Sequence, residues 1–473
     1  MTTDQLRAGC ASPCPSPSLA ELEAMAREVS SWVLRHHQEL PSRPIGQAAS
    51  PAFLASLLHH PAPESGTPFS QVLQRFASSV APWAFRVAHP RFLAFVPSAP
   101  APESILADWL AAGCNFFSGV WLEAAGPSQV ELTVLDWFRA ILGMPTGASG
   151  LLTGGGSEAN LTALATARER LGRDERPRAV LYVSQQRHWS LDRAAHVLGF
   201  WPEQVRPVEV DGERRLSIEA LEREIAADRA AGRVPWAVAA TAGTTNTGAV
   251  DPLPALAALC RQEGLWLHAD AAYGWANALD PEGARELAGI GEADSVALDP
   301  HKWFAQGFDA GALLVRDPAA LERAFRLRPE YMQDVAPATG EVNFCDRGIA
   351  LTRRFRALKV WFSVQALGMG WFRGMVRHTR TLARYAEARL AEAGFEIVSP
   401  ARMGVVCFRW PGSDEDNAAL AEAARRTGEL FMATTMLEGR AVLRFCFVNW
   451  RACADDVDAA VALLSRCADC VAP

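Results

Sequence analysis

The sequence predicts an α/β protein with a mainly parallel sheet, preceded by a helical segment and followed by a smaller α+β part. Between about residues 148 and 315, short apolar runs alternate with stretches of helical periodicity, as in repeated βαβ units. The runs typical of buried strands are 179–184, 236–241, 265–270, 294–299 and 311–317. Helices are expected between them, for example at 191–200 and 253–263. Further on, helical stretches mix with short apolar runs at 405–410 and 442–447, which indicates the α+β part.

The N-terminal segment is expected to be helical. Residues 19–40 have helical periodicity, and Ser18 is a plausible N-cap. A stretch rich in Pro, Gly and Ser follows this helix. The changes of pattern along the sequence predict three parts: an N-terminal helical segment at 1–85, a large α/β domain at 86–360 and a small α+β domain at 361–473.

Composition excludes several classes of function. The chain has 473 residues, 49% of them hydrophobic and 21% charged, with a formal net charge of −7. The acidic balance and the lack of a long basic block argue against nucleic acid as a partner. No apolar run approaches the ~18–20 residues that span a bilayer, and the N-terminus lacks signal-peptide features. We therefore expect a cytoplasmic protein without a membrane partner.

The ten cysteines predict no metal site. Cys467 and Cys470 have a metal-type spacing, but no second pair accompanies them at zinc-site spacing. Reduced thiols are the simpler expectation, and the role of these C-terminal cysteines stays open.

Polar residues follow the apolar runs that we expect to be strands. In open α/β sheets, ligands bind just beyond the carboxyl ends of the strands. "TGGGSEAN" (153–160) precedes a helical stretch, so a phosphate could rest on Gly156 and Ser157, although such a turn can be purely structural. His188 follows the run 179–184 and is either a structural histidine or a flat ring for stacking. Thr245 lies in "TAGTTNTG", which reads equally well as a turn.

Asp270 ends one apolar run, and Lys302 comes shortly after the next. A carboxylate at the end of a buried strand is costly unless something pairs with it, and the small Ala272 beside it leaves room for a flat group. A helix-capping aspartate is the alternative. Lys302 stands in "LDPHKWF", between apolar residues. A desolvated lysine amine is nucleophilic and can form a Schiff base.

One ligand uses all of these features, pyridoxal 5′-phosphate (PLP). Its phosphate would take the Gly/Ser helix start, and its aldehyde would take Lys302. Its ring nitrogen needs a carboxylate, Asp270, that keeps it protonated, so that the ring accepts electrons. Its two faces would contact His188 and Ala272.

The chain resembles the PLP-dependent group II amino-acid decarboxylases, the family of the aromatic-L-amino-acid and glutamate decarboxylases. The resemblance covers nearly the whole chain from about residue 20. It rests on motifs at family-like positions, of which "DPHKW" and "RRFRALK" are the most specific: "HPRFLAF" (89–95), "GGGSEAN", "HADAAY" (268–273), "DPHKW" (299–303), "RRFRALKVWF" (353–362) and "VLRFCFVNWR" (442–451).

The resemblance implies fold type I, with a seven-stranded sheet, and an obligate homodimer in which the N-terminal helices pack on the partner. It implies that Lys302 is the Schiff-base lysine, that Asp270 pairs with the ring nitrogen and that His188 stacks on the ring. It also implies a set of further cofactor contacts: Gly156, Ser157, Ser295 and His301 at the phosphate, Ala272 under the ring and Thr245 nearby.

The implied reaction decarboxylates an L-amino acid through the Lys302 Schiff base and a carbanion, which is protonated to the amine. In animal and plant relatives, a tyrosine on a mobile loop helps this protonation. Counting back from Arg353, that position falls on Phe344, although Tyr331 lies nearby. A phenylalanine there is associated with aldehyde synthases, so oxidative deamination to an aldehyde is the alternative to simple decarboxylation.

The expected substrate is an aromatic or bulky apolar amino acid. The region that shapes the side-chain pocket in relatives is mostly apolar here, and the same residues could also be plain core: Phe92, Phe95, Val96, Ser98, Phe116 and Phe117. Only Arg91 is a candidate partner for a distal carboxylate. A fold-type I aminotransferase would share Lys302 and Asp270 but would need a firm grip on the substrate carboxylate, and is less favoured.

Overall fold

The computed structural model describes residues 1–473 except 11–15, 328–329, 331–333, 335–336 and 472–473. The chain forms two compact units, Met1–His89 and Pro90–Pro473. None of the helices in the described part of the chain combines the length and apolarity needed to cross a membrane.

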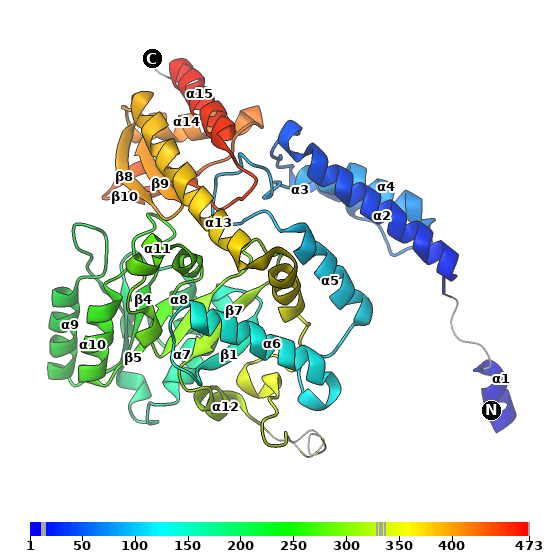
Figure 1. Ribbon diagram of the computed structural model, residues 1–473, viewed down its shortest axis with the longest axis horizontal. Helices are drawn as coiled ribbons and strands as arrows, with labels where there is room; N and C mark the ends of the chain where they lie inside the picture. Colours follow the sequence, from blue (N-terminus) through cyan, green and yellow to red (C-terminus); the bar gives the residue numbers. More distant parts are fainter. Residues whose placement is uncertain (11–15, 328–329, 331–333, 335–336, 472–473) are drawn as a thin grey trace. The chain divides into compact units, whose positions relative to one another are not determined.

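The first unit is helical, as the sequence predicts (Figure 1). Its helices are α1 (Thr3–Gly9), α2 (Leu19–Glu39), α3 (Pro51–Leu58) and α4 (Phe69–Ser79), with short 3₁₀ turns at Leu40–Ser42 and Ala81–Trp83. The Ser18 hydroxyl accepts from the Glu21 N–H while the Glu21 carboxylate accepts from the Ser18 N–H, so a capping box begins α2. Trp32 packs edge-on against Phe76 at 5.2 Å between ring centroids and thereby holds α2 on α4.

The second unit contains the predicted seven-stranded, mainly parallel sheet. Its strands are β1 (Ser149–Thr153), β2 (Ala179–Ser184), β3 (Val205–Val208), β4 (Val234–Thr241), β5 (Trp266–Asp270), β6 (Ser295–Leu298) and β7 (Gly311–Val315). The order is β1-β7-β6-β5-β4-β2-β3, and only β7 runs antiparallel to its neighbours. The five predicted strands are confirmed, and β1 and β3 add the two edges.

Helices cover both faces of this sheet. Every residue of β2, β5, β6 and β7 is buried, as expected of strands covered on both sides. Figure 1 shows α10 and α7 on opposite sides of β5. The helices α6 (Trp121–Ile141), α7 (Gly156–Arg168), α9 (Ile218–Ala230) and α10 (Leu253–Glu263) contact its strands. The other helices of this part of the chain are α5 (Pro102–Cys114), α8 (Ser190–Val197), α11 (Pro281–Glu286) and α12 (Ala319–Phe325).

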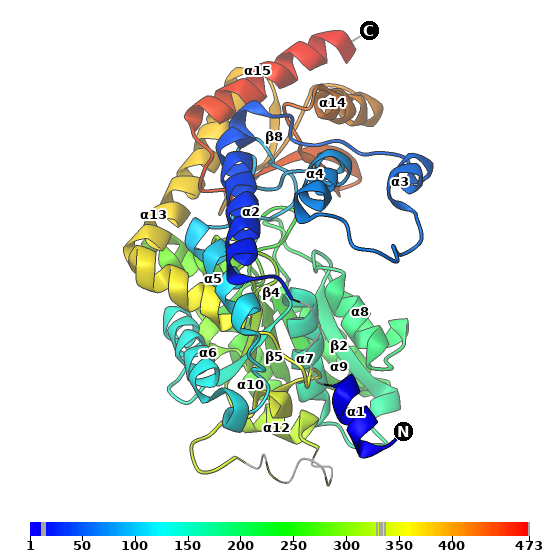
Figure 2. The ribbon, with the colours of Figure 1, turned by 90° about the vertical axis from the view of Figure 1, so that its right-hand side faces the viewer.

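A smaller antiparallel sheet lies beyond the long helix α13 (Ala357–Glu392), which is broken at Gly368 (φ 72°, ψ 152°). Its order is β10-β11-β9-β8, and Figure 2 shows α14 and α15 beside it. The elements are β8 (Glu396–Arg402), β9 (Val405–Arg409), α14 (Asp414–Thr427), β10 (Ala433–Leu437), β11 (Arg440–Cys446) and α15 (Ala454–Val471). Because α13 passes through the expected boundary at 360/361, the division there stays a prediction.

A buried ion pair completes the outer edge of the large sheet. Arg353, in the "RRFRALK" motif, pairs with Glu131 at 2.7 Å, and their side chains are only 2% and 1% exposed. Glu131 accepts from the Leu152 N–H at 2.7 Å, and Arg353 donates to the Leu152 carbonyl at 2.7 Å. The pair therefore provides hydrogen-bond partners for backbone groups at the edge of β1, which would otherwise be left unpaired. The glycine-rich segment follows β1 directly.

Candidate active site

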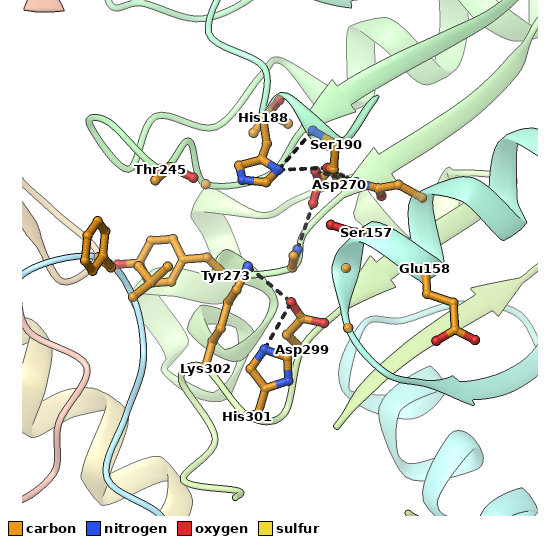
Figure 3. Close-up of a pocket in the computed structure, with 18 of the residues that line it drawn as sticks. Ser157, Glu158, His188, Ser190, Thr245, Asp270, Tyr273, Asp299, His301 and Lys302 are labelled. Carbon is orange, nitrogen blue, oxygen red and sulfur yellow. Dashed lines mark hydrogen bonds and ion pairs between the residues drawn. The ribbon is translucent and has the colours of Figure 1, made fainter. Parts of the chain in front are cut away.

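A cavity of about 510 Å³ lies at the carboxyl ends of the parallel strands (Figure 3). Its lining comes from the segments that follow β1, β2, β4, β5 and β6, together with Phe95 and Val96. Because these strand ends meet at one edge of the sheet, the structure gathers most of the predicted cofactor residues: Gly156, Ser157, His188, Thr245, Asp270, Ala272, His301 and Lys302.

Asp270 offers a buried carboxylate to this cavity. It ends β5 and is 5% exposed. One oxygen accepts from Asn160 Nδ2 at 2.9 Å and the other from the Ala272 N–H at 3.1 Å. Within the described residues, no lysine or arginine forms an ion pair with it. Since a buried charge needs a partner, the geometry suits a cationic group in the cavity.

Lys302 reaches the cavity from the turn after β6. Its Nζ lies 3.1 Å from Asp299 Oδ2 (Figure 3). The next residue, Trp303, is fully buried, donates to Thr379 Oγ1 at 2.8 Å and stacks on Tyr273 with ring centroids 5.4 Å apart. The aromatic neighbour that makes this lysine unusual in the sequence thus anchors the turn, while the amine remains in the cavity.

The segment 154–157, which we call the glycine cradle, leads into the N-terminus of α7. A Cβ on Gly156 would lie 2.9 Å from Ala272 Cβ and 3.1 Å from Asp299 Oδ2, so only glycine allows this close approach. In the described part of the chain, no side chain caps α7. Its first N–H groups are therefore available to an anion such as a phosphate.

His188 presents a neutral ring to the cavity. Burial lowers its pKa, although Asp270 acts in the opposite direction. Its Nδ1 accepts from the Ser190 N–H at 3.3 Å and lies 2.8 Å from Ser190 Oγ (Figure 3). These contacts fix the ring at one side of the cavity, and Ala272 also lines the cavity. The small Ala272 side chain leaves room in the cavity for a flat group.

His301 and Asp299 lie next to Lys302 in the same turn. His301 Nδ1 accepts from the Ala310 N–H at 3.2 Å, and burial lowers the pKa of the ring. Its Nε2 lies 3.7 Å from Asp299 Oδ2. Thr245 enters on the turn after β4, where Arg444 Nη1 donates to its carbonyl at 2.5 Å.

Ser295 does not line the cavity, contrary to the phosphate role expected of it. It is the first residue of β6, whereas the cavity lies beyond the last. Its Oγ is fully buried, accepts from Trp266 Nε1 at 2.8 Å and lies 2.9 Å from His268 Nδ1. We therefore correct its placement to the core behind the site.

Phe344 also lies outside this cavity. It is 0% exposed, at the start of a 3₁₀ turn (Phe344–Arg347), and its ring centroid is 4.8 Å from the Arg353 guanidinium carbon. A ring packed in the core beneath an arginine does not reach the reacting atoms of its own chain. Tyr331, the other loop candidate, lies outside the described residues.

Only two of the six predicted substrate-pocket residues line the cavity, Phe95 and Val96. Phe95 is 55% exposed and has a positive φ of 56°. The other four have structural surroundings: Phe92 is buried against Phe431, Ser98 donates to the Val448 carbonyl, Phe116 is exposed near Phe355, and Phe117 lies beside Gly119.

The cavity also contains residues that sequence reasoning missed, among them Asn160, Ser190, Tyr273 and Asp299. Asn160 stands one helical turn after Gly156, so its spacing placed it on the same face of α7 as the cradle. Asp299 is buried, and one of its oxygens, Oδ1, has no hydrogen-bond partner among the described atoms. No three metal-ligating side chains gather anywhere in the described part of the molecule.

Comparison with known proteins agrees with this geometry. The family described as "Pyridoxal-dependent decarboxylase conserved domain" matches residues 51–411. An aromatic-L-amino-acid decarboxylase of Bacillus atrophaeus is 40% identical over 450 residues, which are 93% of this chain and 94% of that protein. A phenylacetaldehyde synthase of Arabidopsis thaliana is 31% identical over 434 residues, covering 87% of this chain and 89% of the relative.

Solved structures extend the likeness to the whole fold. The crystal structure of Oryza sativa TDC with PLP and tryptamine superposes with a TM-score of 0.92 and 28% sequence identity. The match covers 97% of this chain and 99% of that one.

Proposed function

Since the chain belongs to the pyridoxal-dependent decarboxylase family and is a PLP-dependent carboxy-lyase, we propose that it converts an aromatic L-amino acid to its amine. The observation that carries this proposal is the meeting of Lys302 and Asp270, from neighbouring strand ends, in one cavity with an aromatic border. Phe95 and Tyr273 form that border, which suits a flat apolar side chain.

The residues present fit PLP. The uncapped start of α7 and the close approach at Gly156 suit its phosphate. The Asp270 carboxylate, which lacks a counter-ion in the described chain, suits a protonated ring nitrogen, and Lys302 suits the aldehyde. His188 and Ala272 would cover the two faces of the ring.

Bound PLP supplies an electron-accepting ring for the electrons of the broken Cα–carboxyl bond. The protein's residues prepare and control that event. Asp270 would keep the ring nitrogen protonated, and Lys302 would hold the aldehyde. Asp299 Oδ2, 3.1 Å from Lys302 Nζ, would hold the lysine ammonium whenever that amine is free. The neutral His188 covers one face of the ring and excludes water.

The direct test incubates purified protein and PLP with L-Trp, L-Tyr, L-Phe, L-Dopa and L-Glu. We expect CO₂ and the corresponding amine in equal amounts from at least one aromatic substrate, and little turnover of L-Glu. Preferred turnover of L-Glu would contradict the proposed substrate class, because none of the described residues that line the cavity is an arginine or a second lysine.

Aldehyde formation is the second candidate, because phenylacetaldehyde synthases are among the relatives. Measuring aldehyde and peroxide beside the amine separates the two reactions. A Phe344→Tyr variant should leave the product ratio unchanged, since Phe344 lies in the core of its own chain. A shift from aldehyde toward amine would instead support the loop role expected from the sequence.

An aminotransferase is less favoured, because such an enzyme would need a firm grip on the substrate carboxylate and the described lining holds no arginine. Amino-group transfer to a keto acid would reveal that activity. We also propose a cytoplasmic homodimer, on the basis of the family resemblance. Light scattering of the purified protein tests the dimer.

A further inference from the structure

A chain of hydrogen bonds leads from Asp270 back into the core of the large sheet. Asn160 Nδ2 donates to Asp270 Oδ2 at 2.9 Å, and Asn160 Oδ1 lies 2.8 Å from His268 Nε2. Ser295 Oγ lies 2.9 Å from His268 Nδ1 and accepts from Trp266 Nε1 at 2.8 Å. All five side chains are buried. The chain thus joins the carboxyl end of β5 to the start of β6 through α7.

The chemistry of the partners fixes the direction of every bond. A carboxylate only accepts, so the Asn160 amide turns its NH₂ toward Asp270 and its carbonyl toward His268. His268 must then donate from Nε2. Burial lowers the pKa of His268, so the ring is neutral and its Nδ1 accepts from the Ser295 hydroxyl. Every donor in the chain therefore points toward Asp270. Hydrogen bonds aligned in this way polarise and strengthen one another.

The Asn160 amide is also prevented from flipping. Its Nδ2 lies 2.9 Å from Ser190 Oγ, so its second N–H has an acceptor as well. Ser190 in turn contacts Nδ1 of His188. With both N–H groups and the carbonyl oxygen engaged, this buried amide holds a single orientation. Packing alone does not need this arrangement, because an apolar side chain of similar size would fill the same space in α7 without polar groups to satisfy.

We propose that Asn160 is a positioning residue that fixes Asp270 as a charged acceptor for the cofactor's ring nitrogen, and that His268 and Ser295 act on Asp270 through it. This inference rests on the proposed pairing of Asp270 with that nitrogen. Through Asp270, Asn160 would affect only the ring nitrogen of the cofactor. The inference therefore predicts that loss of Asn160 weakens binding of a ligand with the ring nitrogen and leaves binding of a ligand without it nearly unchanged.

The test compares equilibrium binding of PLP with binding of an analogue that has carbon in place of the ring nitrogen. Wild-type protein should bind PLP more tightly than the analogue. In Asn160→Ala, PLP affinity should fall by about tenfold or more, as expected for a hydrogen bond to a charged group. Affinity for the analogue should change by no more than about twofold, within the range of a neutral contact. Asn160→Leu, which fills a similar volume without polar groups, provides the same comparison if Asn160→Ala does not fold.

Asn417→Ala is the matched control. Asn417 is another buried amide with backbone partners, in α14, and it does not line the cavity. It should leave both affinities unchanged. Equal weakening of PLP and analogue in Asn160→Ala, or no weakening of either, would overturn the inference while leaving the proposed function intact. A wild-type protein that binds both ligands equally would instead remove the Asp270 pairing, and the inference with it.

A double-mutant comparison tests whether His268 acts through Asn160. His268→Phe should weaken PLP binding in the wild-type background, because it breaks the chain behind the amide. The same change should add little in Asn160→Ala, where the chain is already cut. Equal effects in both backgrounds would show that His268 acts independently and would refute this part of the inference.

Discussion

A methyl group added at Gly156 would enter the narrowest part of the glycine cradle. Its carbon would lie 2.9 Å from Ala272 Cβ, whereas carbon atoms at optimal separation are about 3.5–4.0 Å apart. It would also lie 3.1 Å from Asp299 Oδ2, which is held by its ion pair with Lys302. The Ala272 methyl lies on the turn directly after β5, and because it is attached to the backbone it does not swing away. The start of α7 must therefore shift.

Overpacking of this kind costs about 1–3 kcal/mol. Because the shift moves the N–H groups expected to hold the phosphate, we predict that Gly156→Ala weakens PLP binding by roughly 5-fold to 150-fold, the equivalent of that energy. The measurement is a titration of cofactor-free protein with PLP, followed by absorbance. Thermal unfolding of the same sample separates lost affinity from lost fold.

Gly374→Ala is the matched control, because it is the same chemical change in the helix α13. A Cβ at Gly374 would meet nothing within 4 Å. Alanine is favoured over glycine in helices by about 1 kcal/mol, so this variant should bind PLP normally and unfold at the same or a higher temperature. If Gly156→Ala bound PLP as tightly as Gly374→Ala does, the cradle would not be the phosphate site.

Three other changes have defined outcomes. Lys302→Ala should abolish the near-visible absorbance band of covalently bound cofactor, and a persisting band would exclude Lys302 as its attachment point. Arg353→Met should lower the free energy of unfolding by about 3–5 kcal/mol, the cost of removing one partner of a buried pair, because it leaves the Glu131 carboxylate buried without its counter-ion. An unchanged denaturant midpoint would refute this role. Burial lowers the pKa of His188, His268 and His301, so the unfolded chain binds more protons than the native one below their ordinary pKa. The contribution of these histidines to the free energy of unfolding should be complete above pH ~6.5 and fall as the pH drops below it. In His268→Gln, the unfolding temperature should fall less steeply with decreasing pH. The same steepness in the variant and the wild-type protein would show that His268 does not contribute.

The central strands could be predicted because burial on both faces leaves a continuous apolar run in the sequence. β2, β4, β5, β6 and β7 all have this pattern. The two missed strands are edges with weaker signals: β3 is "VRPV", four residues with a proline, and β1 is "SGLLT" with a glycine. Such short edge strands depend on their neighbours for pairing, and β1 also depends on the distant Arg353 and Glu131. The sequence around an edge strand does not show these partners.

The candidate site was predictable to the extent that it follows the ends of strands. Asp270 ends an apolar run, Lys302 and His188 each follow one within four residues, and the parallel topology brings the three together. The aromatic pocket was less accessible to sequence reasoning. Phe92 and Phe95 stand three residues apart on an irregular segment, yet one is buried against Phe431 and the other borders the cavity. Without a regular period, the sequence does not show which way each ring points.

Ser295 and Asn160 show how a residue's position on its element decides its part in the site. Ser295 lies on the strand that leads to Lys302, but at its first residue, so it is separated from the cavity by the length of β6. Asn160 lies on α7, one turn from the cradle, and so its side chain reaches Asp270. The chain of hydrogen bonds nevertheless connects the two through His268, two residues before Asp270 on β5. Ser295, which the sequence placed at the phosphate, is thus connected to the other end of the expected cofactor, where its hydroxyl contacts Nδ1 of the histidine that donates to Asn160.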